Sequence, residues 1–152
     1  MVKAKTEILT KTFDLYPEDS MELGLLCKFG IHRTFRAGYV FINEGEEADK
    51  FYVIVTGNVR ISVQAGESQV TIYTAQPGEI VGFSSLVEPR LYKGTATAVS
   101  TIEVLEFRSS DLQSKMQTYP RLGYIVMYRV SQFLSQRLLH SMFETMSEIV
   151  SH

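Results

Sequence analysis

The chain is poor in residues that bind metals or form covalent crosslinks. It has one cysteine and three histidines in 152 residues. The single cysteine, Cys27, excludes an internal disulfide and any metal site built from several cysteines. Because Cys27 lies in an apolar stretch, we predict that it packs in the core. Among the histidines, His32, His140 and His152, no pair has ligand spacing on a strand. A metal enzyme is therefore not expected, and a haem sensor using Cys27 or His32 is a minor alternative.

Long apolar runs and an excess of charge of one sign are also absent. The formal net charge is −2, whereas nucleic-acid-binding domains more often carry a basic excess. No segment reaches about 18 consecutive apolar residues, so no membrane span is predicted. Residues 1–12 lack the apolar run of a secretory signal. We therefore expect a cytoplasmic protein without a membrane partner. The composition, 45% hydrophobic and 21% charged, indicates one globular domain.

Three regions follow one another within this domain. Residues 1–34 form an N-terminal segment with one short predicted helix. Residues 35–108 alternate between strand-like segments and glycine-containing turns spaced about 8–12 residues apart, which is typical of an antiparallel sandwich or barrel. The run 51–55 is continuous and apolar, as in a buried strand. Residues 109–152 change to a helical period, and Pro120 interrupts them.

The long helix predicted after Pro120 carries an apolar stripe. Residues 122–149 would extend about 40 Å at about 1.5 Å per residue, which is longer than a small β-domain is expected to cover. The excess stripe needs a partner, most simply a second copy of the chain. The alternatives are a helix folded wholly onto its own domain and a helix broken near Ser141. The stripe that we predict for a homodimer interface consists of Val126, Val130, Phe133, Leu134, Leu138, Met142, Met146 and Ile149.

The strand region has a recognisable spacing of glycines and apolar residues. It reads Phe35-x-x-Gly38-x-Val40-x-Ile42-x-Glu44-Gly45-x-x-Ala48-Asp49-x-Phe51-Tyr52-x-Ile54-x-x-Gly57-x-Val59-x-Ile61, and continues through Pro77-Gly78-Glu79-Ile80-Val81-Gly82 and Ile102-Glu103-Val104-Leu105-Glu106-Phe107. This pattern resembles the cyclic-nucleotide-binding domain of Crp/Fnr-type regulators. The resemblance implies a mostly β fold with flanking α: a double-stranded β-helix (jelly-roll, cupin-like) barrel with a short N-terminal helix and a long C-terminal helix. It also implies a regulatory, non-enzymatic protein.

The family holds its nucleotide with a phosphate-binding cassette, which the resemblance places at residues 82–95. In the family, a glutamate accepts from the ribose hydroxyl, and short-helix N–H groups and an arginine hold the cyclic phosphate. Here Gly82 and Leu86 fit the glycine and leucine positions. Phe83 stands at the glutamate position, however, and Tyr92 stands at the arginine position. The resemblance implies cyclic AMP or cyclic GMP as the ligand, and both replacements argue against it.

Other residues of the cassette are candidates to compensate. Arg90 would be the phosphate residue if the loop is two residues shorter before the arginine and carries an insertion after it. Lys93 is the second candidate, as a point charge. The third interpretation is that the loop has no phosphate anchor. Ser84 and Ser85 are candidates to donate to an anion or to cap the short helix.

The long helix supplies further candidates. The resemblance aligns Arg137-Leu138 with the family's arginine–leucine pair, and places Ser141 where a small hydroxyl residue meets the base. Arg121, Arg129 and Arg137 fan across a broad arc of the helix. We expect them mainly to be solvated or paired with acids, with a ligand or partner contact as the alternative.

The leading hypothesis is a non-enzymatic, homodimeric sensor that binds a small ligand flatter or more apolar than a cyclic nucleotide. The alternative is a ligand-free interaction or dimerisation module whose pocket is filled by Phe83. In the transcription-factor branch a helix-turn-helix domain follows the long helix. The chain ends at His152 without one, so direct DNA binding is not expected. We favour a solitary protein, with a truncated regulator as the alternative.

Overall fold

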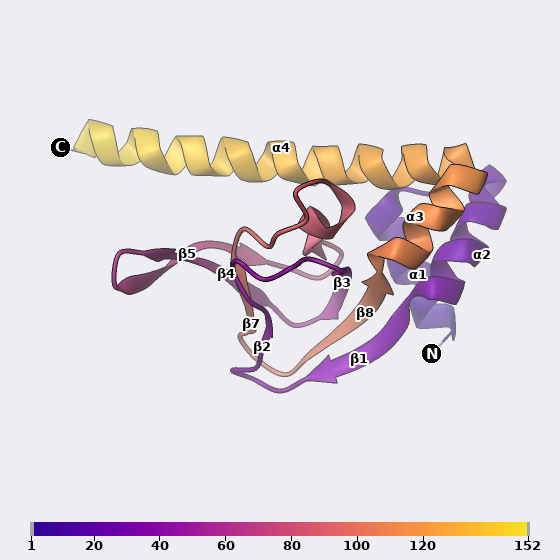
Figure 1. Cartoon of the computed structure of the whole chain (residues 1–152), viewed down its shortest axis with the longest axis horizontal. Helices are drawn as coiled ribbons and strands as arrows, with labels where there is room; N and C mark the ends of the chain where they lie inside the picture. Colours follow the sequence, from indigo (N-terminus) through magenta and orange to yellow (C-terminus); the bar gives the residue numbers. More distant parts are fainter. Residues whose placement is uncertain (1, 152) are drawn as a thin grey trace.

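A computed structural model describes residues 2–151, with side chains described for residues 4–150. Two sheets lie beside a group of short helices, and the long helix α4 runs along one edge of the molecule (Figure 1). The elements in chain order are α1 (Val2–Phe13), η1 (Pro17–Asp19), α2 (Ser20–Phe29), β1 (Ile31–Phe35), β2 (Val40–Ile42), β3 (Lys50–Thr56), β4 (Val59–Ala65), β5 (Ser68–Ala75), β6 (Ile80–Val81), η2 (Phe83–Leu86), β7 (Thr95–Ala98), β8 (Ile102–Arg108), α3 (Ser109–Thr118) and α4 (Pro120–Ser151).

The strands form two antiparallel four-stranded sheets, with orders β1-β8-β3-β6 and β2-β7-β4-β5. This arrangement confirms the mostly β, jelly-roll-like fold with flanking helices. Within the described residues no strand pairing joins the two sheets, so the barrel is open. The apolar run in β3 is explained because the strand is buried on both faces. Phe51 and Val53 face the helices, whereas Tyr52 and Ile54 face the other sheet.

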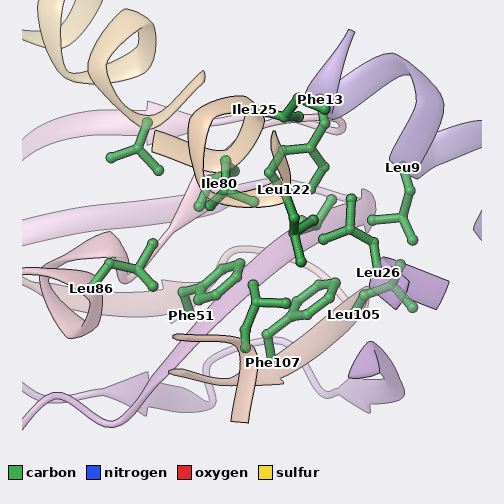
Figure 2. Packing of buried hydrophobic residues seen from close by; sticks show 14 of the residues in the cluster. Leu9, Phe13, Leu26, Phe51, Ile80, Leu86, Leu105, Phe107, Leu122 and Ile125 are labelled. Carbon is green, nitrogen blue, oxygen red and sulfur yellow. The ribbon is translucent and has the colours of Figure 1, made fainter. Parts of the chain in front are cut away.

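The larger core lies between the first sheet and the helices (Figure 2). At its centre the rings of Phe51 and Phe107 stack with their centroids 4.8 Å apart. These residues are directly opposite each other in the β3–β8 ladder, so their side chains lie on the same face. Leu26 of α2 and Leu122 of α4 are fully buried around them. The helices are therefore fixed to the sheet by hydrophobic packing.

The N-terminal region differs from the prediction of one short helix. It contains two α-helices, α1 and α2, and it ends in β1 rather than before the first strand. In α1, Leu9 and Phe13 are buried, and the Thr12 hydroxyl donates to the Gly78 carbonyl at 2.8 Å. Cys27 is half-buried beside the core, as predicted in part. The helix α1 was missed because its few apolar residues, such as Leu9 and Phe13, become buried only when they pack against the sheet and the other helices.

The helix α4 is buried in its first half and exposed in its second. It begins at Pro120, and α3 ends at Thr118, so the proline separates two helices as predicted. The preceding helix α3 begins at Ser109. Beyond residue 133 the helix projects past the core, over the β4–β5 hairpin (Figure 1).

Three residues of the predicted interface stripe have another role. Val126, Val130 and Phe133 are buried in the domain's own core, so they are not available to a partner. The predicted apolar period is correct. However, the same stripe runs from the buried part of α4 into its exposed part, so the sequence does not show where packing against the domain stops. The members that remain exposed are Leu134, Leu138, Met142, Met146 and Ile149.

Candidate functional site

A cavity of about 540 Å³ lies between η2, the second sheet and α4. Its volume is within the range of about 300–1,000 Å³ typical of small-molecule sites. The cassette contributes one wall, α4 another, and strands β2, β4, β5 and β7 the floor. The lining residues are Ile42, Ile61, Ile72, Tyr73, Gly82, Phe83, Ser84, Val87, Tyr92, Lys93, Gly94, Ala96, Met127, Val130, Ser131, Leu134, Arg137 and Ser141.

Gly82 opens the cassette in a conformation that suits only glycine. Its φ is +83°, in the left-handed region. A Cβ atom there would lie 3.0 Å from both Ile42 Cδ1 and the Lys50 carbonyl oxygen. The short helix η2 follows, and the hydroxyls of Ser85 and Ser109 hydrogen-bond beneath it. Gly82 therefore lets the chain leave β6 close to β3 and turn toward α4.

Tyr92, at the position of the family's arginine, fastens the end of the cassette to β3. Its hydroxyl donates to the Lys50 carbonyl at 2.7 Å and accepts from the Lys50 N–H at 3.2 Å. Burial is the largest influence on this phenol and raises the pKa of Tyr92. The ring lines the cavity, but its polar atom is occupied by backbone. Tyr92 therefore acts as a neutral wall residue.

Arg90 does not lie in the cavity. It has a left-handed backbone with φ +58°, and its guanidinium Nε donates to Glu88 at 3.0 Å. The structure therefore does not bring Arg90 to the position of a phosphate anchor. Lys93 does line the cavity, and its side chain is exposed. Ser85 and Leu86 are buried behind the cavity wall, whereas Ser84 lines it.

Arg137 projects from α4 into the wall of the cavity. Its Nη2 donates to the Ile80 carbonyl at 2.6 Å, and its guanidinium carbon lies 5.0 Å from the ring centroids of both Tyr73 and Phe83. Its Nε is buried without an acceptor. Burial lowers the pKa of Arg137, and the nearby Glu79 opposes that shift. One arginine thus connects α4 with β5, β6 and η2.

Phe83 lines the cavity and leaves it open. The expectation of a pocket filled by this ring does not match the geometry, because the ring packs against Arg137 and the space beside it remains. Ser141 also lines the cavity from α4, and its contact with a ligand stays a prediction.

Sequence reasoning missed the contribution of the floor. Tyr73 and Ile72 of β5 and Ile61 of β4 line the cavity. No signal in the sequence identified them, because their position depends on the order of strands in the second sheet. Met127 and Ser131, which line the cavity from α4, were also missed.

The side chains of the other two arginines of α4 bind groups within the domain. Arg121 pairs with the buried carboxylates of Asp19 and Glu22. Arg129 donates from Nε to the Thr12 carbonyl at 2.7 Å and lies 4.8 Å from the Phe133 ring centroid. The prediction of pairing with acids is therefore correct for Arg121 alone.

The described residues contain neither a metal-binding cluster nor a helix that could span a membrane. No group of three or more His, Cys, Asp or Glu that could hold a metal ion occurs among residues that the structure describes. His32 lies 3.9 Å from Glu103 and His140 lies 3.1 Å from Glu144. His152 lies outside the described residues. Across the described part of the chain, every helix is too short or too polar to cross a membrane.

The similar solved structures share this fold. A cyclic nucleotide-binding domain from Methylobacillus flagellatus superposes with a TM-score of 0.85 at 20% identity, covering 97% of this chain and 85% of that one. A putative cyclic nucleotide-binding protein from Geobacter metallireducens gives a TM-score of 0.69 at 26% identity, covering 82% of this chain and 88% of that one. The first likeness supports the fold alone.

The relatives found by sequence are longer proteins, of which this chain covers only a part. A "CRP-like cAMP-activated global transcriptional regulator" of Mycobacterium tuberculosis is 25% identical over 90 residues, covering 59% of this chain and 40% of the relative. "Lysophospholipase NTE1" of Coccidioides immitis is 25% identical over 105 residues, covering 68% of this chain and 6% of the relative. The chain thus spans less than half the length of either protein.

The family model described as "Cyclic nucleotide-binding domain" matches residues 32–119. That range contains both sheets and the complete cassette. By the resemblance described above, Gly82 and Leu86 stand at the family's glycine and leucine positions, and Phe83 and Tyr92 stand at its glutamate and arginine positions. Since the match covers more than half of the 152 residues, the chain belongs to the cyclic nucleotide-binding domain family.

Proposed function

We propose that this domain is a non-enzymatic regulatory module whose small-molecule ligand enters the cavity between the cassette and α4. The observation that carries the proposal is the open cavity of about 540 Å³. The cavity is open although Phe83 and Tyr92 stand where the resemblance places the family's glutamate and arginine. A domain serving only as an interaction surface needs no such cavity, whereas small-molecule sites are concave and mostly apolar, as this one is.

Arg137 couples ligand binding in the cavity to the packing of the cassette against α4. The side chain joins α4 to the Ile80 carbonyl of β6 and to the rings of Tyr73 and Phe83. A ligand beside it changes the packing of the cassette against α4. Ligand binding then shifts an equilibrium between two arrangements of these elements, by as much as its affinity differs between them.

We also infer that a second copy of the chain covers the distal half of α4. Residues 134–151 extend about 27 Å beyond the buried part of the helix, at about 1.5 Å per residue. Their exposed apolar side includes Leu138, Met142 and Ile149. An unpartnered apolar helix face of this length favours self-association in a symmetric dimer.

Cyclic nucleotides are weak candidates for the ligand. A relative is named cAMP-activated, but Phe83 has no acceptor for a ribose hydroxyl and the Tyr92 hydroxyl is bonded to Lys50. Losing a charge-assisted contact costs about 1.5–3 kcal/mol, or about 10- to 100-fold in affinity. The expected result of a calorimetric titration with cyclic AMP or cyclic GMP is therefore weak or undetectable binding.

The cavity itself is tested by filling it. The aromatic dye 8-anilinonaphthalene-1-sulfonate is titrated into the full chain, and Ser131→Trp places a bulky ring in the cavity from α4. Its matched control, Ser135→Trp, changes an exposed serine one turn later that does not line the cavity. Loss of high-affinity dye binding only in Ser131→Trp is expected. Equal binding by both variants would overturn the proposed site.

A further inference from the structure

We propose that the cavity selects an organic anion with a large apolar body, and that Arg137 is the residue that determines this specificity. The inference rests on the proposed function, since it requires a ligand in this cavity. It goes further by naming the chemical class of that ligand: a carboxylate or sulfonate carried on an aromatic or alicyclic skeleton.

The charges around the cavity favour an anion. Its lining contains two cationic side chains, Lys93 and Arg137. No aspartate or glutamate is among the described residues that line it. Inside a partly desolvated space such an imbalance is stronger than in water, because the local dielectric constant is low. An anionic ligand group removes the imbalance, whereas a neutral or cationic ligand does not.

The guanidinium of Arg137 is held but incompletely satisfied. Nη2 uses the Ile80 carbonyl, and Nε is buried without an acceptor. The nearby Glu79 carboxylate and the Tyr73 hydroxyl also favour the charged guanidinium. That carboxylate accepts from the Tyr73 hydroxyl at 2.5 Å and from the Gln76 N–H at 2.7 Å. In the described part of the chain no ion pair includes Arg137. Arg137 is half-buried, and its buried Nε is a donor that a planar oxyanion could satisfy.

Phe83 explains how the anion would be sensed. Its ring is the part of the cassette that packs against the guanidinium, at 5.0 Å. Because the Nε atom of Arg137 is buried, an oxyanion can reach it only if a neighbouring side chain moves aside. The Phe83 ring is one such neighbour. Since Phe83 belongs to η2, its movement also moves the cassette. Binding of the anionic group is thereby coupled to the cassette and to α4.

The remaining walls favour an apolar ligand body. The floor and sides present aliphatic residues such as Ile42, Ile61 and Leu134, together with the faces of the Tyr73 and Tyr92 rings. Burial of apolar surface contributes about 25 cal/mol per Å², without directional requirements. A flat hydrocarbon skeleton gains this contribution. A sugar would gain less, because its hydroxyls lose water and find few polar partners in the mostly apolar lining.

A matched pair of probes isolates the anionic group. We compare 8-anilinonaphthalene-1-sulfonate with N-phenyl-1-naphthylamine, which is the same skeleton without the sulfonate. Both are titrated into the full chain by fluorescence. Wild type is expected to bind the sulfonate more tightly than the neutral probe. Arg137→Gln should weaken sulfonate binding by about 10- to 100-fold and leave the neutral probe nearly unchanged.

Arg129→Gln is the control for the arginine. Arg129 lies on the same helix, donates to a backbone carbonyl and contacts an aromatic ring, yet it does not line the cavity. It should change the affinity of neither probe. Displacement of the dye by 1-naphthoate, in wild type but not in Arg137→Gln, would extend the result to carboxylates. Thermal unfolding of each variant confirms that it is folded.

The outcomes separate this inference from the proposed function. If both probes bind equally and Arg137→Gln affects neither, the anion specificity is wrong while the cavity remains a binding site. If Ser131→Trp also leaves both probes unaffected, the cavity itself is not the site and both proposals fail. Tight binding of cyclic AMP in competition with the dye would overturn the apolar ligand class and leave the cavity as the site.

Discussion

The guanidinium carbon of Arg137 lies 5.0 Å from the centroid of the Phe83 ring. Phe83 occupies the position at which the family resemblance places a glutamate. The contact between α4 and the cassette is therefore a cation–π interaction, worth about 0.5–2 kcal/mol. The buried Nε of Arg137 has no acceptor among the described residues.

Without a ligand, the stability of the domain should depend little on Arg137. Arg137→Met should leave the free energy of unfolding within about 1 kcal/mol of wild type, or raise it, because it removes a buried and incompletely satisfied cation. Arg129→Met should lower it by about 1–2 kcal/mol, because Arg129 donates to the Thr12 carbonyl and to Gln132. Urea denaturation measures both. Equal losses in the two variants would show that Arg137 is as well satisfied as Arg129.

Tyr92→Phe removes the hydroxyl that joins the cassette to Lys50. Two hydrogen bonds are lost at a buried position, so the free energy of unfolding should fall by about 1–3 kcal/mol. The ring that lines the cavity is retained, and the affinity for 8-anilinonaphthalene-1-sulfonate should stay close to that of wild type. A large loss of dye affinity in a stable Tyr92→Phe protein would instead assign the hydroxyl to the ligand.

Gly82→Ala tests the tight start of the cassette. The left-handed backbone costs a non-glycine residue about 1–2 kcal/mol, and the new Cβ would lie 3.0 Å from the Lys50 carbonyl oxygen. Gly66→Ala is the matched control, because it has φ +65° with nothing within 4 Å of its Cβ. Chemical denaturation should show a larger loss for Gly82→Ala. Equal losses would mean that backbone conformation alone matters.

Asp19 should make the stability depend on pH in the acid range. The Tyr16 N–H and then Arg121 lower the pKa of this buried carboxyl below its ordinary value. A depressed pKa stabilises the fold above the pKa of the unfolded chain, and this contribution is lost as pH falls through the lower folded value. The urea midpoint of wild type should therefore drop below about pH 4. Asp19→Asn should show a smaller drop over the same range, and a parallel decline in both proteins would exclude Asp19 as the source.

The exposed half of α4 is tested by charge. Leu138→Glu combined with Met142→Glu places carboxylates on the apolar side beyond the core, where both residues are exposed. Burying unpaired charge is costly, so a dimer formed there should dissociate into monomers. Light scattering after size-exclusion chromatography measures the mass. Gln136→Glu, at an exposed polar position of the same helix, should leave it unchanged, and a dimer that survives the double substitution would place the interface elsewhere.

Much of the fold was predictable because its signals are local. The alternation in Val59, Ile61 and Val63, the turn at Gly57 and the break at Pro120 each depend on neighbouring residues. The start of the cassette was found in the same way, through Gly82. The helix α1 was missed because its apolar side is meaningful only against the sheet.

The site was predictable only where it follows the chain. Gly82, Phe83 and Tyr92 were identified from the cassette, and Arg137 from its place on the long helix. The exclusion of Arg90 required a backbone angle and a partner, Glu88, that spacing does not reveal. The buried face of Val126, Val130 and Phe133 likewise depended on where the core ends.

The sequence by itself therefore determined the cyclic-nucleotide-binding-type scaffold. Through the resemblance, it also placed Phe83 and Tyr92 at the positions of the family's glutamate and arginine. Only the tertiary structure decided that Arg137 lies against Phe83 with an unsatisfied Nε, and that an open cavity remains beside them. The reason is physical: strand and turn signals arise from residues close in the chain, whereas charge balance in a cavity arises from residues that only folding brings together.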